Sequence, residues 1–378
     1  MDKKKIVFIT GTRADYGKLK PLMKVLNNSS KFEIYIFVCG MHLLEKFGST
    51  YNEVLKDGYK NTYIAYGLCP SSNTSINLGN IISYFSGYVE NIKPDMVIVH
   101  GDRIEALAGA IVSALHNIVV AHIEGGEVSG TIDESIRHAI TKFSHIHFVC
   151  NEESKKRLLQ LGEDKKYIFV IGSPDIDIML EKNLPALSNV KEYYGINYEN
   201  YGILMYHPVT TENKDLKKHV RELVDAVIES KKNYIVVYPN NDLGYEIILN
   251  EYDRFQNNNN FKVFPSIRFE YFLTLLRNAD FIIGNSSAGI RESGVYGIPA
   301  IDVGTRQSGR YNIEVSKNIQ HVFENKDDIL RAVKKIDSYR INNSVFGSGD
   351  SKNKFFNIID NLEFNKIELQ KRFIDYNW

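Results

Sequence analysis

Cysteine and long apolar runs are scarce in this 378-residue sequence. Its three cysteines, Cys39, Cys69 and Cys150, are widely spaced and form no C-x-x-C pair. This argues against a disulfide framework and a cysteine-ligated zinc ion, and it is typical of a reducing compartment. No run approaches the about 18 apolar residues that a membrane span needs, and Ile6–Ile9 is too short for a signal-peptide core. We therefore expect a cytoplasmic protein without a membrane partner.

An excess of charge of one sign is also missing. The sequence has 46 Lys and Arg residues and 46 Asp and Glu residues. A protein that binds nucleic acid by neutralising phosphates normally has a basic excess, so nucleic acid is not expected as a partner. Positive charge must instead be local, which suits a small anionic ligand.

Apolar residues, by contrast, are plentiful enough for two hydrophobic cores, at 43% of the chain with 12% aromatic residues. A chain of this length is comfortable for two domains of about 150–200 residues each. Ser173 followed by Pro174 is typical of a helix start, and the periodic pattern weakens over 182–201. We predict a Rossmann-like N-terminal domain at 1–173, a helix and linker at 174–201, a Rossmann-like C-terminal domain at 202–353 and a helical segment at 354–378.

Short apolar strands alternate with amphipathic helices along both halves. The first half has predicted strands at 5–10, 32–39, 96–100 and 119–123, and helices at 18–27, 103–115 and 134–143. The second half has predicted strands at 202–206, 234–238, 261–264, 280–283 and 299–303, and helices at 214–230, 245–255 and 268–278. This alternation predicts parallel sheets covered on both faces. The fold class is therefore α/β, with two doubly wound domains and a ligand in the cleft between them, beyond the carboxyl ends of the strands.

Charged residues gather after two of these predicted strands. Residues 100–105 read His-Gly-Asp-Arg-Ile-Glu, and residues 122–138 contain four carboxylates and two histidines. Clustered carboxylates raise one another's pKa, which makes a competent acid or base near neutral pH. A structural alternative stays open, because Asp102 with Glu105 and Thr131 with Glu134 also fit helix capping boxes. Glu124, between an apolar strand and a glycine pair, has no such explanation.

Other strand ends carry loops that could hold an anion. Residues 11–18 combine glycine with Arg and Lys, and residues 284–292 place serines before a helix, where phosphates bind readily. Arg306 could add positive charge. Each of these has a structural alternative. Residues 11–18 could be a plain glycine turn, the serines at 284–292 could cap a helix, and His207 could be an ordinary loop histidine. Neither a Walker sequence nor G-x-G-x-x-G is present, so a dinucleotide cofactor is not supported.

These strings resemble one family along nearly the whole chain. Gly-Thr-Arg-Ala-Asp-Tyr at 11–16, His-Gly-Asp-Arg at 100–103 and His-Ile-Glu-Gly-Gly-Glu-Val-Ser-Gly-Thr-Ile-Asp-Glu-Ser-Ile-Arg-His at 122–138 resemble the hydrolysing UDP-N-acetylglucosamine 2-epimerases of sialic acid synthesis. His-Pro-Val-Thr-Thr at 207–211, Gly-Asn-Ser-Ser at 284–287 and Gly-Thr-Arg-Gln at 304–307 extend the match. The resemblance implies a fold like B-type glycosyltransferases and the products UDP and N-acetylmannosamine, without a metal or cofactor.

The resemblance also implies roles for individual residues. The positions that match the family's catalytic set are Asp102, Glu124, Asp133 and His207. The candidate substrate and UDP contacts are Arg13, Lys18, Arg103, Asn240, Ile267, Ser286, Ser287, Glu292 and Arg306. Gly17 departs from the pattern, because the animal enzyme has a serine there, and this puts one phosphate-side contact in doubt. A homodimer or homotetramer is expected.

Four alternatives to this function stay open. Very similar enzymes act on UDP-2,4-diacetamido-2,4,6-trideoxy sugars. A non-hydrolysing epimerase would keep the sugar on UDP, but its string resembles His-Val-Glu-Ala-Gly rather than the His-Ile-Glu-Gly-Gly at 122–126. A glycosyltransferase would share the fold, and a non-catalytic sensor would share the binding site.

Overall fold

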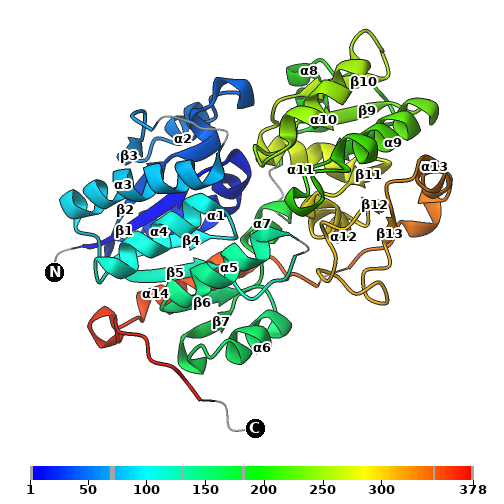
Figure 1. Cartoon of the computed structure of the whole chain (residues 1–378). Helices are drawn as coiled ribbons and strands as arrows, with labels where there is room; N and C mark the ends of the chain where they lie inside the picture. Colours follow the sequence, from blue (N-terminus) through cyan, green and yellow to red (C-terminus); the bar gives the residue numbers. More distant parts are fainter. Residues whose placement is uncertain (1–2, 69–72, 130, 181–183, 344, 376–378) are drawn as a thin grey trace. The chain divides into compact units, whose positions relative to one another are not determined.

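The computed structural model describes residues 3–68, 73–129, 131–180, 184–343 and 345–375. They form two compact units (Figure 1). Unit 1 comprises Met1–Glu127, Asp133–Leu180 and Phe346–Trp378, and unit 2 comprises Val128–Ile132 and Glu181–Val345. Cys69 and part of the predicted linker lie outside the described residues. No described helix is both long and apolar enough to cross a membrane.

Unit 1 is built on a seven-stranded parallel sheet in the order β3-β2-β1-β4-β5-β6-β7. The strands are β1 (Lys4–Thr10), β2 (Phe32–Val38), β3 (Asn61–Ile64), β4 (Met96–His100), β5 (Val119–Ile123), β6 (Ile146–Val149) and β7 (Ile168–Val170). The helices are α1 (Arg13–Asn27), α2 (Tyr51–Lys56), α3 (Thr74–Ile92), α4 (Ile104–Leu115), α5 (Ile132–Phe143), α6 (Glu152–Gln160), α7 (Pro174–Met179) and α14 (Ser351–Asp360). The predicted α/β class is confirmed.

Alternate residues of β1 enter two different cores, as a sheet covered on both faces requires. Ile6 and Phe8 pack in a core with residues of α1 and α14. Val7 and Ile9 pack in a second core with residues of α3, α4 and α5. The central strands are therefore apolar along their length, and their polar residues are left for the strand ends.

Unit 2 has a six-stranded parallel sheet in the order β10-β9-β8-β11-β12-β13. Its strands are β8 (Gly202–Met205), β9 (Tyr234–Val237), β10 (Phe261–Phe264), β11 (Phe281–Gly284), β12 (Ala300–Val303) and β13 (Ile319–Val322). Its helices are α8 (Leu187–Tyr194), α9 (Leu216–Glu229), α10 (Tyr245–Tyr252), α11 (Phe269–Arg277), α12 (Glu292–Tyr296) and α13 (Lys326–Lys334). The predicted strands and helices of this half all occur, within a few residues at their ends.

The sequence prediction lacked strands β3, β6, β7 and β13 and helix α3. Two of the helix starts that it discussed also need correction. The first helix begins at Arg13 rather than Lys18, because Thr12 and Asp15 form a capping box. The alternative capping box of Asp102 and Glu105 is wrong. Arg103 occupies the N-cap position of α4 without a side-chain cap, and its Nε instead donates to Glu105 at 3.2 Å.

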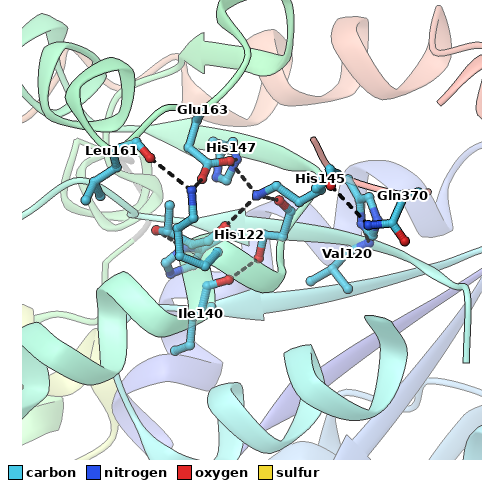
Figure 2. A network of polar contacts seen from close by, with 12 residues as sticks. Val120, His122, Ile140, His145, His147, Leu161, Glu163 and Gln370 are labelled. Atoms are coloured by element: carbon cyan, nitrogen blue, oxygen red, sulfur yellow. Dashed lines mark hydrogen bonds and ion pairs between the residues drawn. The ribbon is translucent and has the colours of Figure 1, made fainter. Parts of the chain in front are cut away.

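The C-terminal segment is attached to unit 1 by polar contacts (Figure 2). His145 accepts a hydrogen bond from the Val120 amide through Nδ1 and donates from Nε2 to the Leu369 carbonyl. Glu163 binds His147 at 3.0 Å and Lys371 at 2.5 Å. Because His147 lies in β6 and His145 directly precedes it, the segment beyond α14 is fixed to the sheet of unit 1.

Candidate active site

The loops after β4 and β5 place the predicted acid–base residues of unit 1 together. These strands are neighbours in register, with His100 opposite Ile123. Asp102 therefore follows one strand end and Glu124 follows the adjacent one. Asp133 lies in the first turn of α5, where its charge favours the helix dipole. The two charged loops that the sequence analysis singled out therefore follow neighbouring strands.

Arg137 is the cation around which these carboxylates gather. It is 2% exposed, forms an ion pair with Asp102, and donates to the Glu127 carbonyl at 3.2 Å. Burial by itself would lower the pKa of its guanidinium. The charges of Asp102, Glu127, Asp133 and Glu124 outweigh burial and raise that pKa above its usual value. Arg137 thus pairs directly with Asp102, and its buried charge also attracts Glu127, Asp133 and Glu124.

Glu124 is held in an unusual backbone conformation. Its φ is 65°, in the left-handed region that residues other than glycine rarely adopt. Its amide donates to the Phe148 carbonyl at 2.8 Å. One carboxylate oxygen accepts a hydrogen bond from Ser173, and the other lies 3.2 Å from His100 Nε2. This side chain, 5% exposed, is therefore oriented from two sides.

His122, the first residue of the 122–138 string, has a structural role. Its Nε2 donates to the Gly101 carbonyl at 2.8 Å, and Nδ1 lies 3.2 Å from the Thr141 hydroxyl. Burial lowers its pKa to about 3, so the ring is neutral at physiological pH. It thereby fixes the backbone immediately before Asp102.

The first glycine loop is braced from within unit 1. A Cβ added to Gly11 would lie 2.5 Å from the carboxyl carbon of Glu105, which explains why glycine is needed there. Lys18 is 8% exposed and its ammonium pairs with the buried Asp175 at 2.9 Å. Arg13 is half-buried at the start of α1. Arg103 follows β4, half-buried, where it contacts Glu105.

In unit 2 a buried asparagine holds His207. The Asn285 side chain accepts from the His207 amide at 2.7 Å and donates to the His207 carbonyl at 2.9 Å. The backbone amide of Asn240 donates a hydrogen bond to His207 Nδ1 at 3.0 Å. Nδ1 therefore carries no hydrogen in this arrangement, and the proton of the neutral ring is on Nε2.

The other predicted UDP contacts also lie at strand ends of unit 2. The Ser286 hydroxyl accepts a hydrogen bond from the Ala288 amide at 3.3 Å, at the N-cap position of a short 3-10 helix. In this structure Ser286 is therefore a helix cap, which was the alternative to a phosphate contact. Arg306 donates to the Asn285 carbonyl at 3.3 Å. The remaining positions are Ser287, which is half-buried, and Glu292 and Ile267, which are buried.

Among the described residues, two groups bring three possible metal ligands within 4.8 Å of one another. Glu124, Glu127 and Cys150 belong to the carboxylate cluster of unit 1. Glu212, His219 and Glu324 form the second group, in which Glu212 accepts from Thr305 and Glu324 accepts from Tyr206. Protein hydrogen bonds therefore already engage the carboxylates of Glu124, Glu212 and Glu324.

Sequence reasoning missed three residues of these clusters, although all three stand in the quoted strings or helix starts. Arg137 follows Asp133 and Glu134 by one helical turn in α5, and this spacing is the signal that could have found it. Asn285 precedes the predicted serines, but its pairing with His207 crosses 78 residues. Ser173 gave only a helix-start signal.

Two parallel-sheet α/β units, each with polar clusters beyond its strand ends, define an architecture like that of B-type glycosyltransferases. A sequence model of the UDP-N-acetylglucosamine 2-epimerase family matches residues 24–360. A UDP-N-acetylglucosamine 2-epimerase of Neisseria meningitidis is 48% identical, over 99% of this chain and 100% of its own length. The chain belongs to the UDP-N-acetylglucosamine 2-epimerase family.

Two further relatives extend the comparison. A UDP-N,N'-diacetylbacillosamine 2-epimerase (hydrolyzing) of Legionella pneumophila is 32% identical, over 97% of this chain and 98% of its own. The crystal structure of Methanocaldococcus jannaschii UDP-GlcNAc 2-epimerase in complex with UDP-GlcNAc and UDP has a TM-score of 0.81 and 25% identity, over 94% of this chain and 99% of that one.

Proposed function

We propose that this chain is a hydrolysing 2-epimerase that converts UDP-N-acetylglucosamine and water into UDP and N-acetylmannosamine, the first step of sialic acid synthesis. The observation that carries the proposal is the carboxylate cluster around Arg137. It provides several acid–base groups in one place, as a reaction with more than one proton transfer requires. A cytoplasmic location and a homodimer or homotetramer are part of the same proposal.

The reaction needs two separate proton carriers. A base removes the C2 hydrogen as a proton while the C1–O bond to UDP breaks, which leaves a glycal with a double bond between C1 and C2. Water then adds its oxygen to C1, and a proton is delivered to the opposite face of C2. Two faces of one carbon cannot be served by one fixed carboxylate, so Asp102, Glu124 and Asp133 are the proposed set.

The departing diphosphate requires positive charge and hydrogen-bond donors. We assign UDP binding to Arg13 and Arg103 in unit 1 and to the unit 2 residues Asn240, Ile267, Ser286, Ser287, Glu292 and Arg306. His207, with its proton on Nε2, is proposed as a donor to the reacting sugar phosphate. Lys18 stays in the set with a lesser role, because its ammonium already pairs with Asp175.

The proposed sugar is N-acetylglucosamine rather than a 2,4-diacetamido-trideoxy sugar. The Neisseria relative carries the first substrate in its name at 48% identity, whereas the Legionella relative carries the second at 32%. The Legionella name also supports the hydrolysing mode. Incubation with each UDP-sugar separately, followed by NMR of the products, distinguishes the two substrates.

Turnover in D₂O tests the mechanism at the level of atoms. Elimination breaks the C2–H bond, so the released N-acetylmannosamine should carry deuterium at C2. In water labelled with oxygen-18, the label should appear on C1 of the sugar and not on UDP, because elimination cleaves the C1–O bond.

Three other results would each contradict the proposal differently. Free sugar with protium at C2 and unchanged configuration indicates simple hydrolysis. A mixture of the two sugars still attached to UDP indicates the non-hydrolysing reaction. Intact donor with no turnover indicates a transferase or a sensor.

A further inference from the structure

Ser173 occupies the N-cap position of α7, but its side chain does not cap the helix. A serine at this position usually accepts a hydrogen bond from a helix amide and so stabilises the helix. Here the hydroxyl donates instead to Oε1 of Glu124, 49 residues earlier in the chain. Ser173 therefore does not stabilise the start of α7 with its side chain, and instead makes a long-range hydrogen bond to a buried carboxylate.

The backbone of Ser173 is fixed on both sides of this contact. Its amide donates to the Phe346 carbonyl at 2.8 Å, and its carbonyl accepts from the Ser351 hydroxyl at 3.0 Å. The residue is fully buried, at 0% exposure. Because the backbone is held at both its amide and its carbonyl and the side chain is closed off from solvent, the hydroxyl is a preoriented donor.

Glu124 has little other freedom. Its left-handed backbone aims the side chain away from the usual strand direction, and His100 Nε2 lies 3.2 Å from the second oxygen. A carboxylate that acts as a general base must place one oxygen within hydrogen-bond reach of the proton that it removes from the substrate. The Ser173 hydroxyl therefore supplies a hydrogen bond that orients the carboxylate, whose second oxygen faces His100.

We propose that Ser173 is a positioning residue for the epimerase reaction, which acts by holding the Glu124 carboxylate in the orientation for proton transfer. This inference rests on the proposed function. Ser173 does not touch the substrate in this assignment, so it should affect the rate of the chemical step and not the binding of UDP.

The first test compares Ser173→Ala with a matched variant, Ser113→Ala. Ser113 is also a fully buried serine of unit 1, and its hydroxyl donates at 2.6 Å to a carbonyl of its own helix. It lies near the C-terminal end of α4, whereas Asp102 precedes the N-terminal end of that helix. We expect Ser173→Ala to lower kcat by about 10- to 100-fold, as small misplacements of catalytic groups do. KM and UDP affinity should change by less than about twofold, and Ser113→Ala should keep kcat.

The second test places Ser173→Ala in a Glu124→Gln background. A residue that acts only through the Glu124 carboxylate should have no further effect once that carboxylate is gone. If the double variant falls below Glu124→Gln by the same factor that Ser173→Ala shows alone, the role of Ser173 is structural and the inference is wrong.

The wild-type measurement separates the two proposals. If wild-type protein releases no UDP from UDP-N-acetylglucosamine, the proposed function fails. If the wild type turns over and Ser173→Ala retains its kcat, only the positioning role of Ser173 is refuted.

Discussion

Lys371 joins the C-terminal segment of unit 1 to the end of α5, and its replacement measures the strength of that attachment. Its ammonium donates to the carbonyls of Thr141 and Ser144 at 3.0 and 2.6 Å and pairs with Glu163 at 2.5 Å. Because both carbonyls lie at the C-terminal end of α5, the ammonium also interacts favourably with the helix dipole. We expect Lys371→Met, which keeps the apolar stem, to lower the free energy of unfolding.

The magnitude follows from the groups that Lys371 contacts. Burial raises the pKa of Glu163, but His147, Lys371 and Lys142 outweigh burial and lower it from 4.5 to about 2. That lowering is worth about 3 kcal/mol, which three donors share. Each carbonyl hydrogen bond adds about 1 kcal/mol.

The ion pair shifts the pKa of its two partners to different extents relative to burial. Burial lowers the pKa of Lys371 despite the attraction of Glu163, because the lysine has one carboxylate whereas Glu163 has three donors. The desolvation of the Lys371 ammonium therefore offsets part of the stabilisation that its contacts provide. The expected net loss is about 2 kcal/mol, or a Tm lowered by about 4–8 °C for a unit of this size.

Thermal unfolding of Lys371→Met is compared with that of Lys366→Met. Lys366 lies in the same segment, but its ion pair with Glu363 is exposed at both ends and should contribute about 0–1 kcal/mol. The pKa of Glu163 is lowered in the folded state, so its stabilisation is present above about pH 4.5 and is lost as the pH falls towards 2. The difference between wild type and Lys371→Met should therefore shrink over that range. Equal losses for the two variants at pH 7 would refute the reasoning.

Two further predictions concern unit 2. Gly284→Ala should destabilise the protein by about 3 kcal/mol or more in urea unfolding, because its φ is 127° and an added Cβ would lie 1.9 Å from the Met205 carbonyl oxygen. Gly79→Ala in α3 is the control and should be neutral or stabilising, since nothing lies within 4 Å of its Cβ position. Nitrogen-15 NMR should show neutral His207 with its proton on Nε2, because the Asn240 amide donates to Nδ1. A protonated Nδ1 in the neutral ring would contradict this arrangement.

Local patterns in the sequence predicted much of the fold. Strands β4 and β5 begin and end at the residues where the alternation of apolar and polar segments placed them. The start of α1 could also have been predicted, since Thr12 and Asp15 have the spacing of a capping box. The neighbouring glycine and arginine favoured a ligand-binding loop there instead. Such signals depend only on neighbours within a few residues.

The candidate site was only partly accessible in this way. Its acidic members stand in one continuous string, so sequence could gather Glu124 and Asp133 near Asp102. The residues that orient them come from elsewhere: Arg137 reaches back to Asp102 from α5, and Ser173 reaches Glu124 from α7. The order of residues along the chain does not show which buried polar groups will hydrogen-bond or pair with one another.

The sequence by itself determined the α/β class, the alternation of strands and helices, and the loops where chemistry was to be sought, because these follow from periodicity and from the strand-end rule of parallel sheets. The tertiary structure decided which side chains share a proton, a hydrogen bond or a charge. It paired Lys18 with Asp175, His207 with Asn285 and Glu163 with Lys371, contacts that span 78 residues or more. Those pairings are selected by the cost of burying a polar group without a partner, and this cost exists only after the chain has packed.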